Sequence, residues 1–146
     1  MKYKFGKIDI LCVGNIKRAD IYFAAQGEYL KRLTPYGKLN VVEFEDEGKL
    51  QKHINASAHK IALTIDGKAM PSEVFAQNLG KMGVGGISHI QFIIGGAEGL
   101  SPRVVEQCNV KISLSLMTFT HHMARILLLE QIYRAVRLLN NEPYHK

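Results

Sequence analysis

A glycine-rich segment, Ile94-Gly95-Gly96-Ala97-Glu98-Gly99-Leu100, is the first place where residue types indicate binding chemistry. It follows the apolar run His89–Ile94 directly, and glycines after a buried strand let the backbone take positive φ and approach a ligand closely. In open α/β sheets, ligands bind at the carboxyl ends of strands. The segment has neither the G-x-G-x-x-G spacing of a dinucleotide site nor the Gly-Lys-Ser/Thr of a phosphate-binding loop. The residues of this segment therefore fit two interpretations, a ligand-binding loop and a tight strand-to-helix turn.

A second candidate segment, Ser113 to His122, mixes apolar side chains with hydroxyl groups and ends in two adjacent histidines. A metal site needs further ligands, and no Cys, His, Asp or Glu cluster is spaced to supply them. We therefore expect no metal. We interpret His121 as a positioned or capping histidine at the start of the last helix.

The third candidate is the end of the chain, Glu142-Pro143-Tyr144-His145-Lys146. It combines an aromatic ring for base stacking, an imidazole that titrates near neutral pH and a cation for phosphate. Chain ends are often solvated and irregular. An RNA-contacting tail and a frayed end are therefore the two alternatives.

Length, composition and charge restrict the class of protein. A chain of 146 residues with an apolar fraction of 47% fits one compact domain, residues 1–146, with a real core. We expect no membrane span and no secretory signal, and hence a cytoplasmic protein, since no stretch approaches about 20 apolar residues. Cys12 and Cys108 are expected to be reduced core thiols. The net charge of +6 favours phosphate backbones or anionic membranes as partners.

Strand-like and helix-like patterns alternate along the chain, and these elements must position the candidate segments. Strands are predicted at Ile8–Val13, Leu39–Phe44, Lys60–Ile65, His89–Ile94 and Ile112–Leu116. Helices are predicted over Ala19–Leu33, around Leu50 and Ile54, from Ser72 to about Met82, after Ser101, and from about Met123 to Leu139. Asp66-Gly67 is expected to close the third strand with a turn, and Ser72 and Ser101 to cap helices. The alternation predicts an α/β domain with a mostly parallel sheet flanked by helices.

The last predicted helix is apolar around much of its circumference, from Met123 through Ile132 to Leu139. A helix of this kind must be buried on two sides. One side is expected to be the sheet, and the other a partner chain, with Ile132 as a candidate residue for the contact. The pattern therefore predicts a homodimer.

Several longer motifs occur in a fixed order. They are Ile94-Gly95-Gly96-Ala97-Glu98-Gly99-Leu100, Leu114-Ser115-Leu116-Met117-Thr118-Phe119-Thr120-His121, Arg125, Glu130-Gln131-Ile132-Tyr133-Arg134-Ala135 and Pro143-Tyr144-His145. In this arrangement the chain resembles the rRNA large-subunit methyltransferase H family, whose members are small stand-alone proteins of the SPOUT class. The segments at residues 11–14, 29–32 and 63–68 also fit, so the resemblance spans nearly the whole chain. Ala97 and Thr120 depart from the usual family residues, and the segment Glu45–Ala58 is short.

The resemblance implies a deep trefoil knot in the C-terminal segments, with S-adenosylmethionine bound by the knotted loops. The cofactor would contact Leu63, Gly95, Gly96, Leu114, Ser115, Leu116, Met117, Thr118 and Phe119. The catalytic site would contain Tyr144 and His145, and the candidates for RNA contacts are His121, Arg125, Arg134 and Lys146. The family acts as a homodimer on the assembled ribosome and methylates N3 of a pseudouridine in large-subunit (23S) rRNA.

The chemistry of this reaction requires removal of a proton. N3 of the uracil ring is a poor nucleophile until its proton is lost, and His145, with a reference pKa of about 6.5, is our candidate base. Alternatively, His145 only binds RNA, and another group or the solvent takes the proton.

Two other classes of function are also compatible with parts of the sequence. A non-catalytic RNA-binding or ribosome-associated module is favoured by the charge alone, and it would not bind S-adenosylmethionine. A flavodoxin-like oxidoreductase is suggested by the strand-helix alternation, but the sequence has no phosphate-binding fingerprint.

Overall fold

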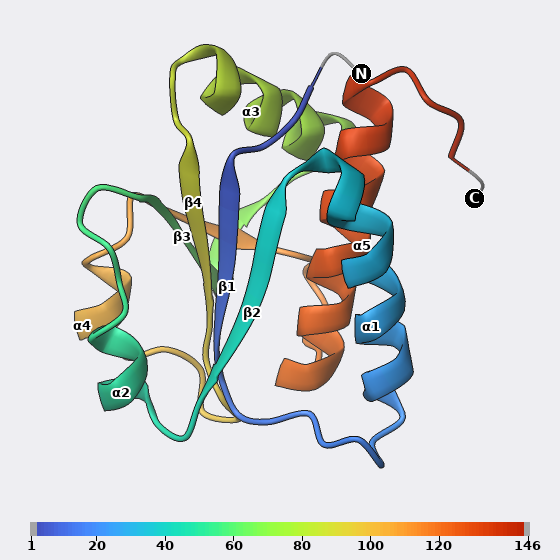
Figure 1. The fold of residues 1–146 in the computed structure, drawn as a ribbon. Helices are drawn as coiled ribbons and strands as arrows, with labels where there is room; N and C mark the ends of the chain where they lie inside the picture. Colours follow the sequence, from blue (N-terminus) through green and yellow to red (C-terminus); the bar gives the residue numbers. More distant parts are fainter. Residues whose placement is uncertain (1–2, 145–146) are drawn as a thin grey trace.

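The computed structural model describes residues 3–144. In chain order the elements are β1 (Lys7–Val13), α1 (Tyr22–Leu33), a 3₁₀ helix (Thr34–Tyr36), β2 (Lys38–Phe44), α2 (Glu47–Gln51), β3 (His59–Ala69), α3 (Ser72–Val84), β4 (His89–Ile94), α4 (Pro102–Val105), β5 (Val110–Ser113) and α5 (His121–Leu139). The alternation predicted from the sequence is confirmed (Figure 1).

The strands of residues 3–144 form one sheet with the order β2-β1-β4-β3-β5, and every neighbouring pair is parallel. Because all strands point the same way, the loops that follow them gather along one edge of the sheet, where ligands bind in this architecture. The central strand β4 has the bounds predicted for it, and all of its residues after His89 are buried, as expected for a strand covered on both faces.

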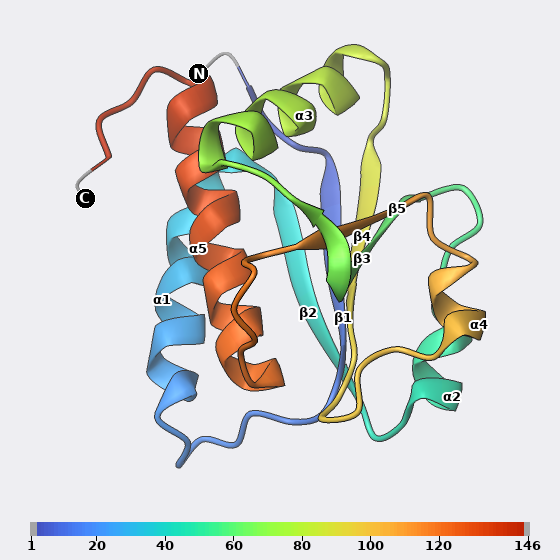
Figure 2. The same ribbon diagram turned by 180° about the vertical axis from the view of Figure 1, so that it is seen from behind.

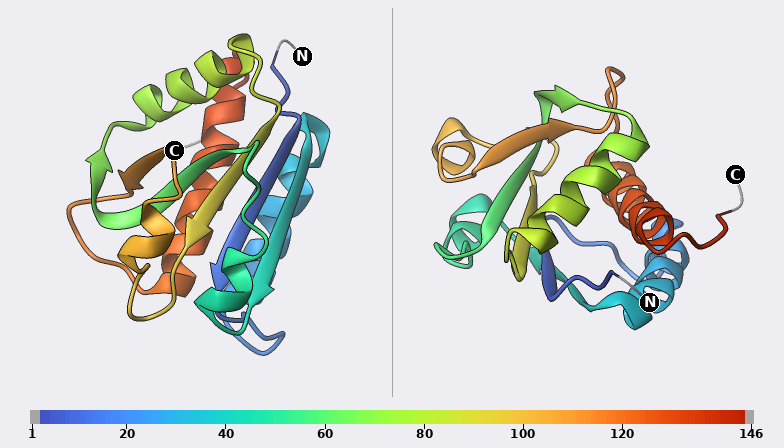
Figure 3. Two further views of the ribbon diagram at one scale, coloured as in Figure 1. Left: turned by 90° about the vertical axis from the view of Figure 1, so that its left-hand side faces the viewer. Right: turned by 90° about the horizontal axis from the view of Figure 1, so that it is seen from above.

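Helices cover the two faces of the sheet unequally. One face packs against α1, α3 and α5, and the other is covered at one end by the short helices α2 and α4 (Figure 3). The larger core lies on the first face and includes Ile10, Phe92, Leu128 and Ile132. The smaller core, with Leu11, Leu50, Ile93 and Val104, lies under α2 and α4.

The prediction of a turn at Asp66-Gly67 was wrong, because β3 continues through these residues to Ala69. The register with β5 shifts between Leu63 and Lys68, so the strand bulges and then resumes pairing. A Cβ at Gly67 would lie 2.5 Å from the carbonyl carbon of Ile112, so this glycine permits close strand contact. The strand β5 is correspondingly shifted and ends at Ser113, before the predicted Leu116.

Helix starts were predicted with mixed success. Ser101 accepts a hydrogen bond from the Val104 amide and caps α4, as expected. Ser72 is not an N-cap: Pro71 holds that position, and the Ser72 hydroxyl donates to Gln131 Oε1 on α5 at 2.6 Å. α1 begins at Tyr22, three residues after the predicted start at Ala19, and Ile21 is exposed.

The apolar circumference of α5 is explained within the chain. The helix packs against the sheet and is flanked by α1 and α3, so Leu128, Leu129, Ile132 and Val136 are fully buried in one copy (Figure 2). The expectation that Ile132 lies at a contact with a partner chain was therefore wrong.

The two cysteines are free thiols, with Cys12 buried and Cys108 half-buried. None of the helices in residues 3–144 is long and apolar enough to cross a membrane.

Candidate active site

A cleft of about 900 Å³ lies at the carboxyl edge of the sheet, among the second half of β3 and the segments that follow β4 and β5. Its volume is in the range of small-molecule sites. The cleft is lined by Leu63, Thr64, Ile65, Asp66, Ile94, Gly95, Gly96, Ala97, Glu98, Gly99, Leu100, Pro102, Val105, Lys111, Ser113, Leu114, Ser115, Met117, Thr118, Phe119, Thr120, His121 and Ala124. The glycine-rich segment and the hydroxyl-rich segment thus form one cavity.

The glycine-rich segment is tightly folded. The Gly99 amide donates to the Gly96 carbonyl at 3.0 Å, and Gly99 has φ +76°, which favours glycine. A Cβ at Gly95 would lie 2.5 Å from the carbonyl carbon of Gly99, so no side chain fits there without moving backbone. Positive φ is therefore needed at Gly99, whereas Gly95 is needed for close backbone approach.

The segment after β5 is shaped by its own hydroxyl groups. Ser113 Oγ donates to the Ser115 carbonyl at 2.7 Å, and the Met117 amide donates to Ser115 Oγ at 3.0 Å. These bonds turn the chain so that Met117 and Phe119 line the cleft, while Leu116 is 93% exposed and lies outside it.

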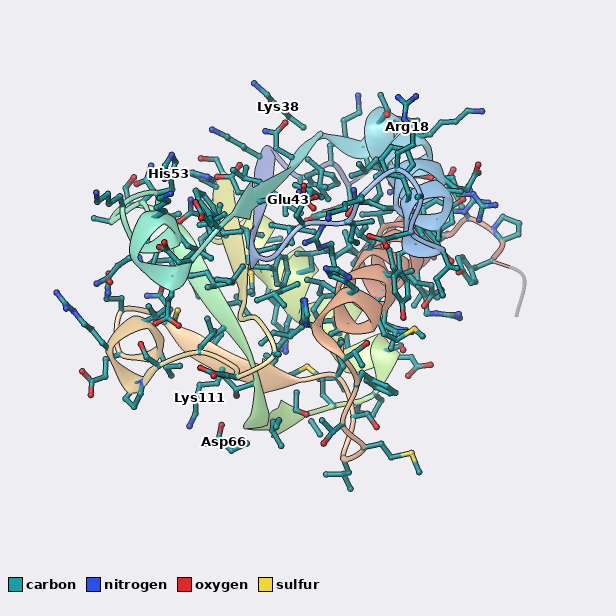
Figure 4. All side chains as sticks on the ribbon, turned by 90° about the horizontal axis from the view of Figure 1, so that it is seen from below. Arg18, Lys38, Glu43, His53, Asp66 and Lys111 are labelled. Atoms are coloured by element: carbon teal, nitrogen blue, oxygen red, sulfur yellow. The ribbon has the colours of Figure 1, made fainter. Side chains whose placement is uncertain are left out.

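The structure gathers eight of the nine proposed cofactor residues around the cleft, all except Leu116. Sequence reasoning missed the contribution of Thr64, Ile65 and Asp66. Thr64 and Ile65 were assigned only to the strand, and Asp66 to the turn expected after it, although the strand's position beside the two candidate segments was a signal for all three. Asp66 accepts a hydrogen bond from Lys111 at 3.0 Å at the rim, and this pairing lowers the pKa of Asp66 (Figure 4).

The cleft offers backbone amides and carbonyls between apolar walls formed by Leu63, Leu100, Leu114 and Phe119. Such a lining suits a flat, largely apolar ring system with a few hydrogen-bonding edges. Within residues 3–144, no three His, Cys, Asp or Glu side chains are grouped to hold a metal ion.

His121 begins α5 and lines the cleft, but it does not cap the helix, because Thr120 is the N-cap residue and makes no side-chain cap bond. Its ring lies 4.3 Å from the ring of His122, and Tyr22 packs edge-on against His122 at 5.8 Å. Burial, together with the nearby His121 and Arg125, lowers the pKa of His122. His122 is therefore neutral at pH 7.

Arg125 is buried, with a side chain only 1% exposed. It forms an ion pair with Glu43 on β2 at 2.6 Å and also donates to Gln26 Oε1 at 3.0 Å and the Gly14 carbonyl at 3.3 Å. The interpretation of Arg125 as an RNA contact was wrong, because a buried guanidinium with these partners offers RNA no surface. Its role is to join α5 to β2, α1 and the loop after β1.

The tail does not reach the cleft of its own chain, since no residue of segment 140–144 lines it. Instead, Tyr144 lies along α5, where its hydroxyl donates to the Glu130 carboxylate and its ring lies under the Arg134 guanidinium at 4.2 Å. Arg134 is also paired with Glu130 at 2.9 Å. His145 and Lys146 lie outside the described residues.

The Tyr144 phenol is held in its protonated form. Burial, together with the hydrogen bond to Glu130 and its charge, raises the pKa of Tyr144 to about 12. At neutral pH this side chain donates a hydrogen bond and does not act as a base.

Comparisons with known proteins place this site in a family. A family model described as "Predicted SPOUT methyltransferase" matches residues 7–145. Proteins named ribosomal RNA large subunit methyltransferase H are similar over almost their whole length. The one from Bifidobacterium animalis subsp. lactis is 40% identical over 95% of this chain and 99% of its own. The one from Halothermothrix orenii is 41% identical over 96% and 99%. The chain belongs to the ribosomal RNA large subunit methyltransferase H family of SPOUT methyltransferases.

Similar solved structures support the fold alone. A probable methylase family protein from Haemophilus influenzae Rd KW20 has a TM-score of 0.55 at 10% identity, covering 98% of this chain and 71% of that chain. A second structure, of a hypothetical protein, has a TM-score of 0.53 at 16% identity, covering 93% and 82%.

Proposed function

We propose that this chain is a cytoplasmic enzyme, a single domain over residues 1–146, which transfers a methyl group from S-adenosylmethionine to N3 of a pseudouridine in 23S rRNA on the assembled ribosome. The observation that carries the proposal is the cleft. The two motifs most specific to the family, at 94–100 and 114–121, are 14 or more residues apart in sequence and line one cavity. Relatives that are about 40% identical carry the name of a large-subunit rRNA methyltransferase.

The residues of the cleft fit S-adenosylmethionine. Gly95 has no room for a Cβ beside the Gly99 backbone, and Gly99 takes a positive φ, so this loop stays compact beside the cleft. The walls at Leu63, Leu114 and Phe119 suit an adenine ring. The cofactor supplies a methyl group that its sulfonium makes electrophilic. The task of the protein is therefore to hold and orient the two reactants and to exclude water.

The tail is proposed to act on the base. His145 would take the N3 proton, and Tyr144, which keeps its own proton at neutral pH, would donate a hydrogen bond to the RNA. His121 at the cleft rim, Arg134 beside Tyr144, and Lys146 remain candidates for RNA contacts.

A homodimer is proposed from two observations other than the buried face of α5. Large apolar side chains are exposed at the start of α1, at the start of α5 and in the segment after β5: Ile21, Phe23, Leu116, Met117, Phe119 and Met123. The two helix starts lie side by side near the cleft (Figure 1). Several large apolar side chains exposed on such segments are typical of a protein interface. In addition, Tyr144 lies outside the cleft of its own chain, so a second copy is needed to bring a tail to a cofactor.

We also propose that the C-terminal segments form the deep trefoil knot of the SPOUT class. In support, the segments 95–100 and 114–120 meet around one cleft, and the chain then turns back into α5, which packs beside α1.

The proposal is tested with labelled S-adenosylmethionine and three substrates: 70S ribosomes, isolated large subunits and naked 23S rRNA. We expect methyl transfer to ribosomes, with the label recovered as N3-methylpseudouridine by mass spectrometry of the nucleosides. Binding to ribosomes without binding of S-adenosylmethionine would identify a non-catalytic module and contradict the proposal. Label in a different nucleoside would contradict the assigned substrate.

A further inference from the structure

The turn after α5 is fixed by side-chain and backbone bonds. Asn140 pairs with the backbone of Tyr3 in both directions: its Oδ1 accepts from the Tyr3 amide at 2.8 Å, and its Nδ2 donates to the Tyr3 carbonyl at 3.1 Å. Asn141 has φ +53°, a conformation that asparagine tolerates. The Glu142 amide donates to the Arg137 carbonyl at 2.9 Å. The direction in which the tail leaves α5 is thus determined locally.

Beyond the turn, Tyr36, Arg137 and Glu142 form a polar cluster. The Tyr36 hydroxyl donates to Glu142 Oε1 at 2.7 Å and accepts from Arg137 Nη1 at 3.3 Å. Arg137 Nη1 lies 3.4 Å from Glu142 Oε2. Arg137 also donates from Nε at 3.0 Å and Nη2 at 2.5 Å to the carbonyl of Pro143. One guanidinium therefore holds a side chain and the backbone of the tail together.

The cluster connects segments that are far apart in sequence. Tyr36 ends the 3₁₀ helix after α1, is 3% exposed, and lies 106 residues from Glu142. The Arg137 and Glu142 side chains are 24% and 33% exposed, so the pair is only partly accessible to water. Hydrogen bonds between charged groups with limited access to water are stronger than exposed surface pairs.

The bonds do not serve to cover the core. Pro143 is exposed, and Tyr144 is the one large apolar group that the described part of the tail places against α5. If the tail had a purely structural role, two hydrogen bonds from Arg137 to the Pro143 carbonyl would add little to the stability of the fold. What the cluster does determine is the course of the backbone immediately before Tyr144.

We propose that Tyr36, Arg137 and Glu142 are positioning residues. They hold the backbone of the tail in one conformation, so that Tyr144 and the adjacent His145 are already oriented toward the reacting base. This inference rests on the proposed role of the tail in methyl transfer. A displacement of about 1 Å in a reacting group can cost on the order of 100-fold in rate, so the anchoring of the tail affects turnover.

The test uses full-length Tyr36→Phe and Glu142→Gln. Each removes bonding capacity in the cluster with almost no change in side-chain shape. Glu45→Gln is the matched control, because Glu45 pairs with Lys49 on the exposed α2 side of the molecule. Methyl transfer to ribosomes is measured under saturating conditions, together with the Kd for S-adenosylhomocysteine and the heteronuclear NOE of the Tyr144 amide.

We expect kcat to fall about tenfold or more in both cluster variants, with unchanged cofactor Kd, a lower NOE at Tyr144 and no change in Glu45→Gln. The double variant should lose little beyond either single one, because the two residues act through one cluster. Wild-type kcat in both variants overturns the inference, as does a lower thermal midpoint with wild-type kcat measured well below that midpoint.

Failure of the inference is separable from failure of the proposed function. If the proposed function is wrong, the wild-type chain does not methylate ribosomes, or His145→Ala retains full activity. If only the positioning role is wrong, His145→Ala loses activity and Tyr36→Phe does not.

Discussion

The two ends of α5 are built in different ways, although both belong to the proposed site. At its start, the loops that line the cleft are shaped by local contacts, namely tight glycines and the short-range bonds of the Ser113 and Ser115 hydroxyls, and the N-cap residue makes no side-chain bond. At its end, the chain is held by side chains: Asn140 is bonded to Tyr3, and Arg137 and Glu142 are both bonded to Tyr36.

The difference follows from what each end is proposed to bind. A cofactor held by backbone edges and apolar walls needs close approach, so side chains there must be small or turned away. A tail that acts on a base needs a defined course and has no secondary structure of its own. Side-chain bonds supply that course. The exposed apolar groups near the cleft then remain for a second copy to cover.

The largest expected effect is at the cleft end, in Gly95→Ala. The added methyl would lie 2.5 Å from the Gly99 carbonyl carbon, so the loop must shift and S-adenosylmethionine binding should be lost in calorimetry. Gly27→Ala is the matched control. Nothing lies within 4 Å of its added Cβ, and alanine in a helix should stabilise α1 by about 0.5–1 kcal/mol. Wild-type affinity in Gly95→Ala would show that the cofactor binds elsewhere.

A smaller effect is expected in Arg125→Met, at the start of α5. Breaking the buried pair with Glu43 should lower the free energy of unfolding by about 3 kcal/mol, because one partner loses its counter-charge and the Gly14 carbonyl loses a donor. The loss should be visible in urea denaturation. Unchanged stability with weaker ribosome binding would instead restore Arg125 as an RNA contact.

The smallest effect is expected at Asp9, on the opposite face of the sheet from both ends of α5. Burial disfavours its charge, but hydrogen bonds from His89 at 2.7 Å and Gln91 at 3.1 Å outweigh this, and the pKa of Asp9 is lowered from 3.8. Because the folded pKa is the lower one, the stabilisation is present above pH 3.8 and is lost as the pH falls through the folded value. Asp9→Asn should cost about 1.5 kcal/mol at pH 7, with a flatter loss of stability below pH 4 and unchanged methyl transfer. An equal loss at pH 7 and pH 3 would disprove the titration argument.

Local patterns predicted most of the fold. β4 was predicted to the residue, and Ser101 as a cap, since both depend on a few neighbouring residues. The bulge in β3 was missed because Asp66-Gly67 is an ordinary turn pair, and only pairing with Ile112 keeps it extended.

The site was also predicted only in part, because contacts between segments far apart in sequence leave no local pattern. Family motifs identified the cleft residues, but Arg125 was assigned to RNA because a sequence shows its charge and not its partner, Glu43, 82 residues away. The glycines of this segment were expected to supply positive φ, which belongs to Gly99, whereas Gly95 permits close approach to the Gly99 backbone. The cluster at Tyr36 was not anticipated, because nothing local connects a tyrosine after α1 with the tail.

The central claim is that a cofactor cleft and a tail from two copies make one active site. Co-expression of Gly95→Ala and His145→Ala chains with different tags, followed by two-step purification of the mixed dimer, tests it directly. Each chain alone should be inactive, whereas the mixed dimer retains one intact cleft opposite one intact tail and should show about half of the wild-type methyl transfer per dimer. A purified mixed dimer without activity, from chains that fold and bind ribosomes, would contradict this account.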